Sequence, residues 1–119
     1  MALHHASPAE IVDLSPMGDE LRNNHTAAIV KTDEFEAVRL VVRAGALLKQ
    51  HQVPESITLH CLEGRVELGL GDSSVELKAN EWLYLEGGVP HSVYGLEDSS
   101  ILLTIILAKS KEKPRMAAG

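Results

Sequence analysis

Aromatic residues are scarce in this sequence: one Trp, one Phe and two Tyr make up 3% of the 119 residues. A hydrophobic core must therefore consist mainly of Val, Leu and Ile, and branched aliphatic residues of this kind favour β-strands over helices. Hydrophobic residues account for 45% of the chain and charged residues for 24%, which is ordinary for a folded globular protein. The length suits one compact domain and leaves little room for a second.

Cysteine and long apolar segments are also lacking. Cys61 is the one cysteine of the chain, which excludes an intrachain disulfide bond and a cluster of thiolate metal ligands. The first residues contain no cationic segment followed by an apolar stretch, and no apolar run reaches the length of a transmembrane helix. We therefore expect a cytoplasmic protein that makes no contact with membranes.

Positive charge is in the minority, with 11 Lys and Arg against 17 Asp and Glu and a net charge of -6. The basic residues form no stripe, so we do not expect nucleic acid as a partner. They are concentrated only within residues 109–115, where Glu112 and Pro114 interrupt them. We interpret residues 109–119 as a solvated C-terminal tail.

Residues 1–27 are mixed and polar, and we expect them to form an N-terminal arm. Ser7-Pro8-Ala9-Glu10 is typical of a helix start, with Ser as the cap and Pro in the first turn. Ser15-Pro16 would end such a helix within about two turns. The arm is therefore predicted to be extended or to contain a short helical turn.

Residues 28–108 show the alternation of apolar and polar residues that indicates β-strands. About eight short strands are separated by turn residues at intervals typical of a sandwich or barrel. They are expected near residues 29–30, 35–42, 57–62, 66–70, 75–77, 82–85, 91–94 and 101–107. We predict a single all-β domain.

Two of the six histidines stand out, because His51 and His91 each follow a glycine-marked bend that leads into a strand. A histidine held in this way can be a metal ligand, a proton carrier or simply a polar group at the end of a strand.

The spacing around these two histidines resembles the two motifs of the cupin superfamily. In the first motif a glycine, five residues and a histidine are followed by a later glycine, as in Gly45, His51 and Gly64. Gly88-Val-Pro-His91 fits the core of the second motif. The resemblance extends over residues 35–107 and implies a jelly-roll β-barrel, also called a double-stranded β-helix.

The sequence departs from both motifs at several positions. The family's second histidine and its carboxylate fall on Val53 and Ile57, and the glycine, proline and asparagine of its second motif fall on Asn80, Glu86 and Gly95. Two of the four usual metal ligands, His51 and His91, are therefore present.

Two neutral imidazoles give too few donors and no negative charge to hold a dication tightly. The sequence therefore predicts that any divalent transition metal, Fe, Mn, Ni or Zn, is weakly held by His51 and His91.

Side-chain alternation predicts which residues line the pocket. The expected lining consists of Lys49, His51, Val53, Ile57, Leu59, Cys61 and His91. Cys61 is either a third metal ligand or a small buried core residue, and His60 points to the opposite face. Trp82 and Tyr84 share one face of their strand, and either they or Leu83 and Leu85 face the pocket.

Four functions fit these features. The first is binding of a small organic ligand in an apolar pocket, oriented by His51 and His91. The resemblance implies two others: a metal-dependent dioxygenase, isomerase or decarboxylase, and a metal-free enzyme with a histidine base. The fourth is a purely structural protein with a closed pocket. The resemblance also implies a homodimer.

Overall fold

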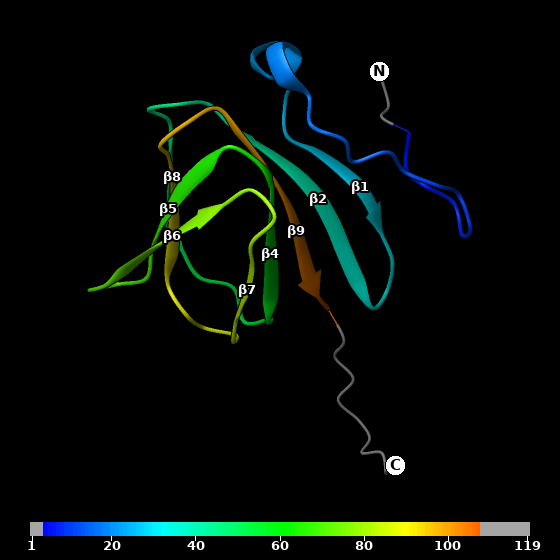
Figure 1. Ribbon diagram of the computed structural model, residues 1–119. Coiled ribbons are helices and arrows are strands. Elements are labelled where there is room, and N and C mark those ends of the chain that lie inside the picture. Colours follow the sequence, from blue (N-terminus) through cyan, green and yellow to red (C-terminus); the bar gives the residue numbers. More distant parts are fainter. Residues whose placement is uncertain (1–3, 108–119) are drawn as a thin grey trace.

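The computed structural model describes residues 4–107, which form nine strands and one short 3₁₀ helix (Figure 1). The helix is η1 (Gly18–Asn23), and the strands are β1 (Ala27–Lys31), β2 (Phe35–Val42), β3 (Leu47–His51), β4 (Ile57–Glu63), β5 (Arg65–Gly69), β6 (Ser74–Lys78), β7 (Trp82–Leu85), β8 (His91–Gly95) and β9 (Ser99–Ile106). The prediction of an all-β domain is confirmed. The strand beyond the eight expected from alternation is β3.

The strands form two antiparallel sheets that pack face to face as a jelly roll. One sheet has the order β1-β2-β9-β4-β7 and the other β3-β8-β5-β6. The core lies between them and includes Ile57, Leu59, Val66, Leu68 and Ile101, each at most 2% exposed. Alternation explains these positions, because every second residue of β4 and of β5 faces the opposite sheet.

Of the two alternatives for the N-terminal arm, the structure shows the extended one over residues 4–17, with a tight turn after Ser7 in place of a helical turn. Glu10 donates its N–H to the Ser7 carbonyl at 3.0 Å, and Ala9 has a positive φ of 72°. Pro8 then occupies the second position of a type II turn, where proline is common, as it is at a helix start. Helical structure lies further on, in η1, where Leu21 is 1% exposed.

The segment before η1 is fixed to the barrel by the carboxylate of Glu63. Met17 and Gly18 donate their backbone N–H groups to it at 2.9 and 3.1 Å, and the Ser100 hydroxyl donates at 2.7 Å. The Arg39 guanidinium lies 3.5 Å from the same carboxylate, and both side chains are largely buried. Glu63 thus joins the N-terminal segment to β2, β4 and β9.

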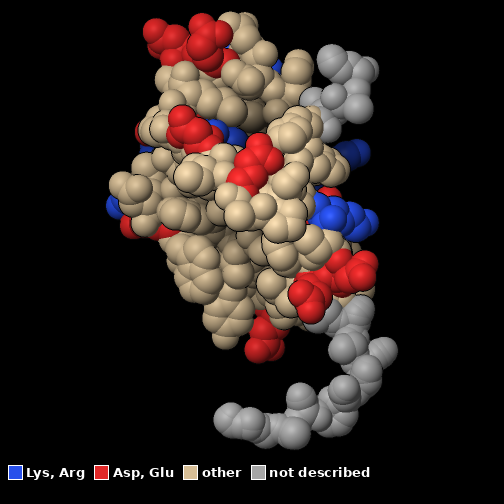
Figure 2. Space-filling view, turned by 90° about the vertical axis from the view of Figure 1, so that its right-hand side faces the viewer, with Lys and Arg blue, Asp and Glu red and all other residues tan. Residues whose placement is uncertain are grey.

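Charged groups are dispersed on the side of the molecule shown in Figure 2, where acidic and basic side chains alternate with wide uncharged areas. Within residues 4–107, no helix has the length and apolar character needed to cross a membrane.

Candidate functional site

A cavity of about 160 Å³ lies between the two sheets. Both sheets contribute to its lining, which consists of Leu40, Leu48, His51, Ile57, Leu59, His91, Ser92, Val93 and Leu103. Alternation along β8 turns the Ser92 hydroxyl away from the cavity, where it lies beside Gly69. The polar side chains that face the cavity are therefore the two imidazoles, and the rest of the wall is hydrocarbon.

The pairing of β3 with β8 brings the two imidazoles together. His51 and His91 are direct partners in this antiparallel ladder, and their ring centroids lie 4.4 Å apart with the planes at 61°. His91 is 7% exposed, whereas His51 is exposed. Residues 40 positions apart in the sequence therefore form one polar corner of the cavity.

Each imidazole is oriented by a backbone carbonyl two residues earlier in the chain. Nδ1 of His91 lies 3.0 Å from the Val89 oxygen, and Nδ1 of His51 lies 3.3 Å from the Lys49 oxygen. A carbonyl oxygen can only accept a hydrogen bond, so each Nδ1 carries a proton. In the neutral ring this leaves Nε2 with a free lone pair, ready to accept a hydrogen bond or to bind a metal.

Two loops, residues 52–56 and 86–90, are tied together next to the histidines. The Gln52 side chain donates to the Gly88 carbonyl at 2.7 Å, and the Gly88 N–H donates to the Val53 carbonyl at 2.8 Å. A side chain at Gly87 would collide with the Pro54 carbonyl, so the close approach of the loops requires glycine there. These contacts fix the ends of β3 and β8 that carry the imidazoles.

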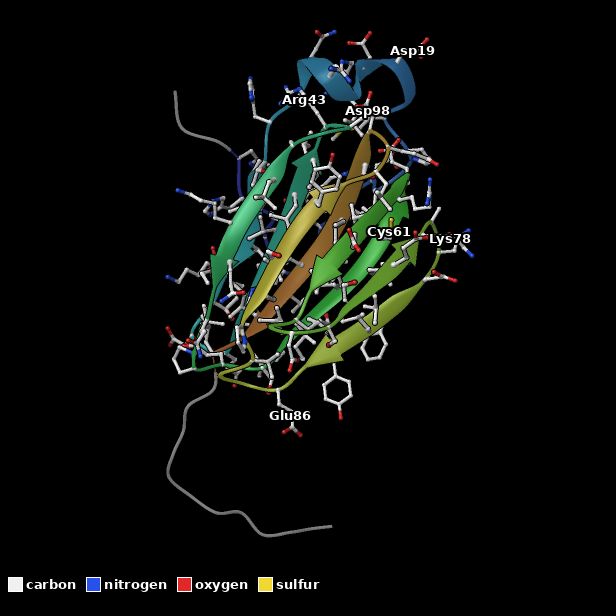
Figure 3. The ribbon with its side chains drawn as sticks, turned by 90° about the vertical axis from the view of Figure 1, so that its left-hand side faces the viewer. Asp19, Arg43, Cys61, Lys78, Glu86 and Asp98 are labelled. Carbon is white, nitrogen blue, oxygen red and sulfur yellow. The ribbon has the colours of Figure 1, made fainter. Side chains whose placement is uncertain are left out.

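Three residues of the expected lining lie elsewhere. Lys49 is exposed, because a register shift between Leu48 and His51 interrupts the alternation and places Leu48 at the cavity instead. Val53 packs against the core without lining the cavity. Cys61 is buried toward the opposite end of the barrel from Glu86 (Figure 3).

Cys61 has the properties of a core residue. It is 0% exposed, and its thiol donates a weak hydrogen bond to the Glu63 carbonyl at 3.4 Å. Burial raises the pKa of this thiol to about 11. Because Cys61 does not border the cavity that His51 and His91 line, it is not placed to act as a third ligand.

The remaining candidate side chains point outward. Glu86 extends from its loop into solvent at the lower end of the molecule in Figure 3. Trp82 and Tyr84 are 58% and 57% exposed, while Leu83 and Leu85 pack against the core. Of the two alternatives for this strand, the leucine face is the one turned inward.

Sequence reasoning missed four residues of the cavity wall: Leu40, Leu48, Val93 and Leu103. The apolar patterns of β2, β8 and β9 indicate that Leu40, Val93 and Leu103 are buried, whereas Leu48 lies on β3, the strand that alternation did not predict. Which buried residues border a void depends on how the two sheets pack, and no local pattern contains that information.

The side chains around the cavity do not fit a tightly bound metal ion. Within residues 4–107, no group of three or more His, Cys, Asp or Glu side chains converges on one point. The two Nε2 atoms are suitable donors, but Ile57 contributes hydrocarbon to the wall, and Val53 packs into the core. The site thus falls short of the three or four protein ligands usual for zinc and similar metals.

No protein-family model matches the sequence, and no curated protein matches it at a significant level of similarity. Solved structures do resemble the fold. A conserved protein of unknown function from Streptococcus pyogenes is 15% identical with a TM-score of 0.72, and the alignment covers 92% of this chain and 97% of that one. An RmlC-like cupin protein from Desulfovibrio desulfuricans is 20% identical with a TM-score of 0.65, covering 89% and 98%.

A third likeness is to oxalate decarboxylase from Bacillus subtilis, a protein described with Mn(II) centres. It is 20% identical with a TM-score of 0.60, covering 63% of this chain and 22% of that one. At these identities the likenesses concern the fold and leave the activity open. The described residues therefore have the two-sheet jelly-roll fold of these cupin structures.

Proposed function

We propose that the protein binds a small organic molecule with an apolar body and one polar group in the cavity between the sheets. The observation that carries this proposal is the contrast within the cavity wall, where two adjacent imidazoles are the polar side chains in an otherwise hydrocarbon lining. Sites for small molecules commonly have this composition, since apolar walls supply affinity and a few polar groups fix the orientation.

The volume of the cavity limits the ligand. An engineered apolar cavity of about 150 Å³ stays dry and binds benzene, and the cavity here measures about 160 Å³. The ligand body is therefore about the size of a six-membered ring or a short branched chain. A dissociation constant of roughly 10 µM to 1 mM is expected for so few atoms.

The hydrogen-bonding state of the imidazoles defines the polar group. With Nδ1 committed to a carbonyl, a neutral imidazole presents Nε2 as an acceptor, which suits a hydroxyl group of the ligand. When protonated, the same atom becomes a donor and suits a carbonyl or carboxylate oxygen. Alcohols, carbonyl compounds and carboxylic acids with compact apolar bodies are therefore the proposed ligand class.

Titration with benzyl alcohol, benzoate and toluene, followed by NMR chemical shifts, tests this proposal. We expect saturable binding, with benzyl alcohol or benzoate bound more tightly than toluene. In His91→Leu the affinity for the polar probes should fall about tenfold, the loss of one hydrogen bond, while toluene still binds. His60→Leu, altered on the outer face, is the matched control and should behave as the wild type. Absence of saturable binding by all three probes would contradict the proposal.

A second candidate is a metal-dependent enzyme, and the distance of 4.4 Å between the two imidazole ring centroids favours it. The two histidines would supply part of the coordination shell, and a chelating substrate or water would supply the rest. Elemental analysis of untagged protein after incubation with Fe, Mn, Ni and Zn tests this candidate. Stoichiometric metal that is lost in both His51→Ala and His91→Ala would support it, and a wild type without metal would exclude it.

The cytoplasmic location stays a prediction.

A further inference from the structure

A groove of about 500 Å³ lies on the outer surface of the four-stranded sheet, the sheet at the left in Figure 1. Residues of β3, β5, β6 and β8 line it, together with the turn that joins β5 to β6. Because Val66 and Leu68 of β5 are buried in the core, Glu67 and Gly69 between and after them face this groove. Its volume lies in the range of roughly 300–1,000 Å³ that is typical of small-molecule sites.

Gly69 forms a hollow in the floor of the groove. It pairs with Ser92 on one side and with Ser74 on the other, and it has no side chain to fill the space between them. A Cβ atom at this position would lie 2.5 Å from Oγ of Ser92, so this hydroxyl lies directly over the glycine. The floor of the groove therefore presents serine hydroxyl groups around an open space.

The next row across the sheet places an aromatic ring beside a carboxylate. Tyr94 is the register partner of Glu67 on one side and of Leu47 on the other. Tyr94 is 38% exposed and Leu47 is 56% exposed. The Ser74 hydroxyl donates to Oε2 of Glu67 at 3.0 Å, which links this row to the floor. The groove thus combines a flat apolar surface with hydrogen-bonding groups.

Asp72 borders the groove from the turn between β5 and β6. The Leu70 N–H donates to the Ser73 carbonyl at 2.7 Å, and Gly71 has the positive φ of 81° that this turn requires. The turn is therefore held in place by its own backbone, and it carries the carboxylate of Asp72 at a fixed position beside the hollow.

The two carboxylates of the groove are not neutralised by neighbours. Within residues 4–107, neither Glu67 nor Asp72 forms an ion pair with Lys or Arg. Glu76, the partner of Glu67 on β6, differs in this respect, because Arg65 lies 3.2 Å from its carboxylate. The charge of the groove opposes the binding of anions, nucleic acid included.

We propose that this groove binds a neutral sugar in its pyranose form, with one face of the sugar ring against Tyr94 and Leu47. A pyranose has faces of C–H groups and a rim of hydroxyl groups, and an aromatic ring offers a matching flat apolar surface. The rim then faces the carboxylates of Glu67 and Asp72, which accept strong hydrogen bonds from hydroxyl groups. The Ser92 hydroxyl both donates and accepts, as the sugar hydroxyls do.

The mixture of donors and acceptors favours a sugar over a cation. An ammonium group only donates hydrogen bonds, so the donor capacity of the serine hydroxyls would be left unused. The site also differs from the cavity of the proposed function, because it lies on the opposite side of the same sheet and does not involve the imidazoles.

Titration with the methyl glycosides of glucose, galactose, mannose, fucose and xylose, followed by NMR chemical shifts, tests the proposal. We expect at least one to bind saturably with a dissociation constant of roughly 0.1–10 mM, with the largest shifts in β5, β8 and residues 70–73. His91→Leu should bind this sugar as the wild type does. Absence of saturable binding by all five would overturn the proposal. Tighter binding of tetramethylammonium than of every sugar would also overturn it, because the groove would then be a cation site.

Substitution of the tyrosine tests the stacking contact. Tyr94→Ala should weaken sugar binding by about tenfold or more, because the apolar platform is lost. Tyr84→Ala is the matched control, since Tyr84 is 57% exposed but lies on β7 of the other sheet. It should bind the sugar as the wild type does. Equal weakening by both substitutions would refute the assignment to this groove.

Substitution of the carboxylate tests the hydrogen bonds. Glu67→Gln keeps the shape of the side chain, removes its charge and should weaken sugar binding by about tenfold. Glu76→Gln makes the same change one strand away, at a carboxylate already paired with Arg65, and should have no effect. Wild-type affinity in both Glu67→Gln and Tyr94→Ala would refute the proposal. Far-UV circular dichroism verifies that the variants are folded.

Discussion

Replacement of Glu63 by Gln should destabilise the protein strongly, although the change adds no bulk and leaves the cavity untouched. The carboxylate accepts hydrogen bonds from two backbone N–H groups and from the Ser100 hydroxyl, and it faces the guanidinium of Arg39. The amide of Gln keeps one acceptor oxygen and places an NH₂ donor opposite other donors. It also leaves the charge of Arg39 without a partner.

The magnitude follows from the burial of the pair. Removing one partner of a fully buried ion pair costs about 3–5 kcal/mol, and a hydrogen bond to a charged group contributes about 1.5–3 kcal/mol. Because the side chains of Glu63 and Arg39 are still 13% and 12% exposed, solvent screens part of this interaction. We therefore expect a loss of about 2–4 kcal/mol in the free energy of unfolding, a large share of the 5–15 kcal/mol typical of a domain.

The effect should depend on pH in a defined direction. Burial alone would raise the pKa of Glu63, but hydrogen bonds from Met17, Ser100 and Gly18 and the charge of Arg39 outweigh it, so the pKa lies below its ordinary value of 4.5. The unfolded chain binds a proton more readily than the folded protein. The stabilisation is therefore complete above the unfolded pKa and is lost as the pH falls through the folded pKa.

Urea unfolding of the wild type and of Glu63→Gln at pH 7 and at several lower pH values measures both effects. The difference between the two proteins should shrink below about pH 4.5. Glu97→Gln is the control, because Glu97 pairs with Arg65 on the surface, where its side chain is 56% exposed. It should change the stability by less than about 1 kcal/mol. The reasoning is wrong if the two variants are equally stable, or if the deficit of Glu63→Gln is the same at every pH.

Three further predictions concern the cavity and the core. Gly87→Ala should lower the free energy of unfolding by about 1–3 kcal/mol, seen as a lower urea midpoint, because the alanine side chain would collide with the Pro54 carbonyl and push the two loops apart. An unchanged midpoint would show that the loops adapt. Leu59→Ala should cost about 2–5 kcal/mol and enlarge the cavity, so that naphthalene-sized probes bind to the variant and not to the wild type. Cys61 should react with thiol reagents only as fast as the protein opens, because the thiol is buried and its pKa is about 11; rapid labelling in native buffer would contradict its placement in the core.

The strand pattern was the most predictable part of the molecule. Alternating residues such as Val66 and Leu68 specify a strand with one buried face by themselves, and the structure buries both completely. The turn at Pro8 was less predictable, because proline after serine suits a helix start and a turn alike. The positive φ of Ala9 decides in favour of the turn, and alanine is not a residue type that predicts a positive φ.

The candidate site was likewise predictable only in part. The glycine-marked bends before His51 and His91 distinguished these two histidines from the other four in the sequence. Such bends can be predicted because the residues within a turn determine its conformation. Their separation of 4.4 Å and their orientation by carbonyl groups depend on the pairing of β3 with β8. The resemblance could suggest this pairing, but no local pattern could measure it.

The sequence by itself determined the all-β class and distinguished His51 and His91 from the other histidines, because alternation, composition and turn residues act over a few neighbouring positions. The tertiary structure alone decided that Leu48 rather than Lys49 faces the cavity, and that Cys61 lies in the core away from it. It also decided that Trp82 and Tyr84 face outward. Register shifts and the packing of one sheet on another join residues that are distant in the chain, so their outcome depends on contacts that no short segment contains.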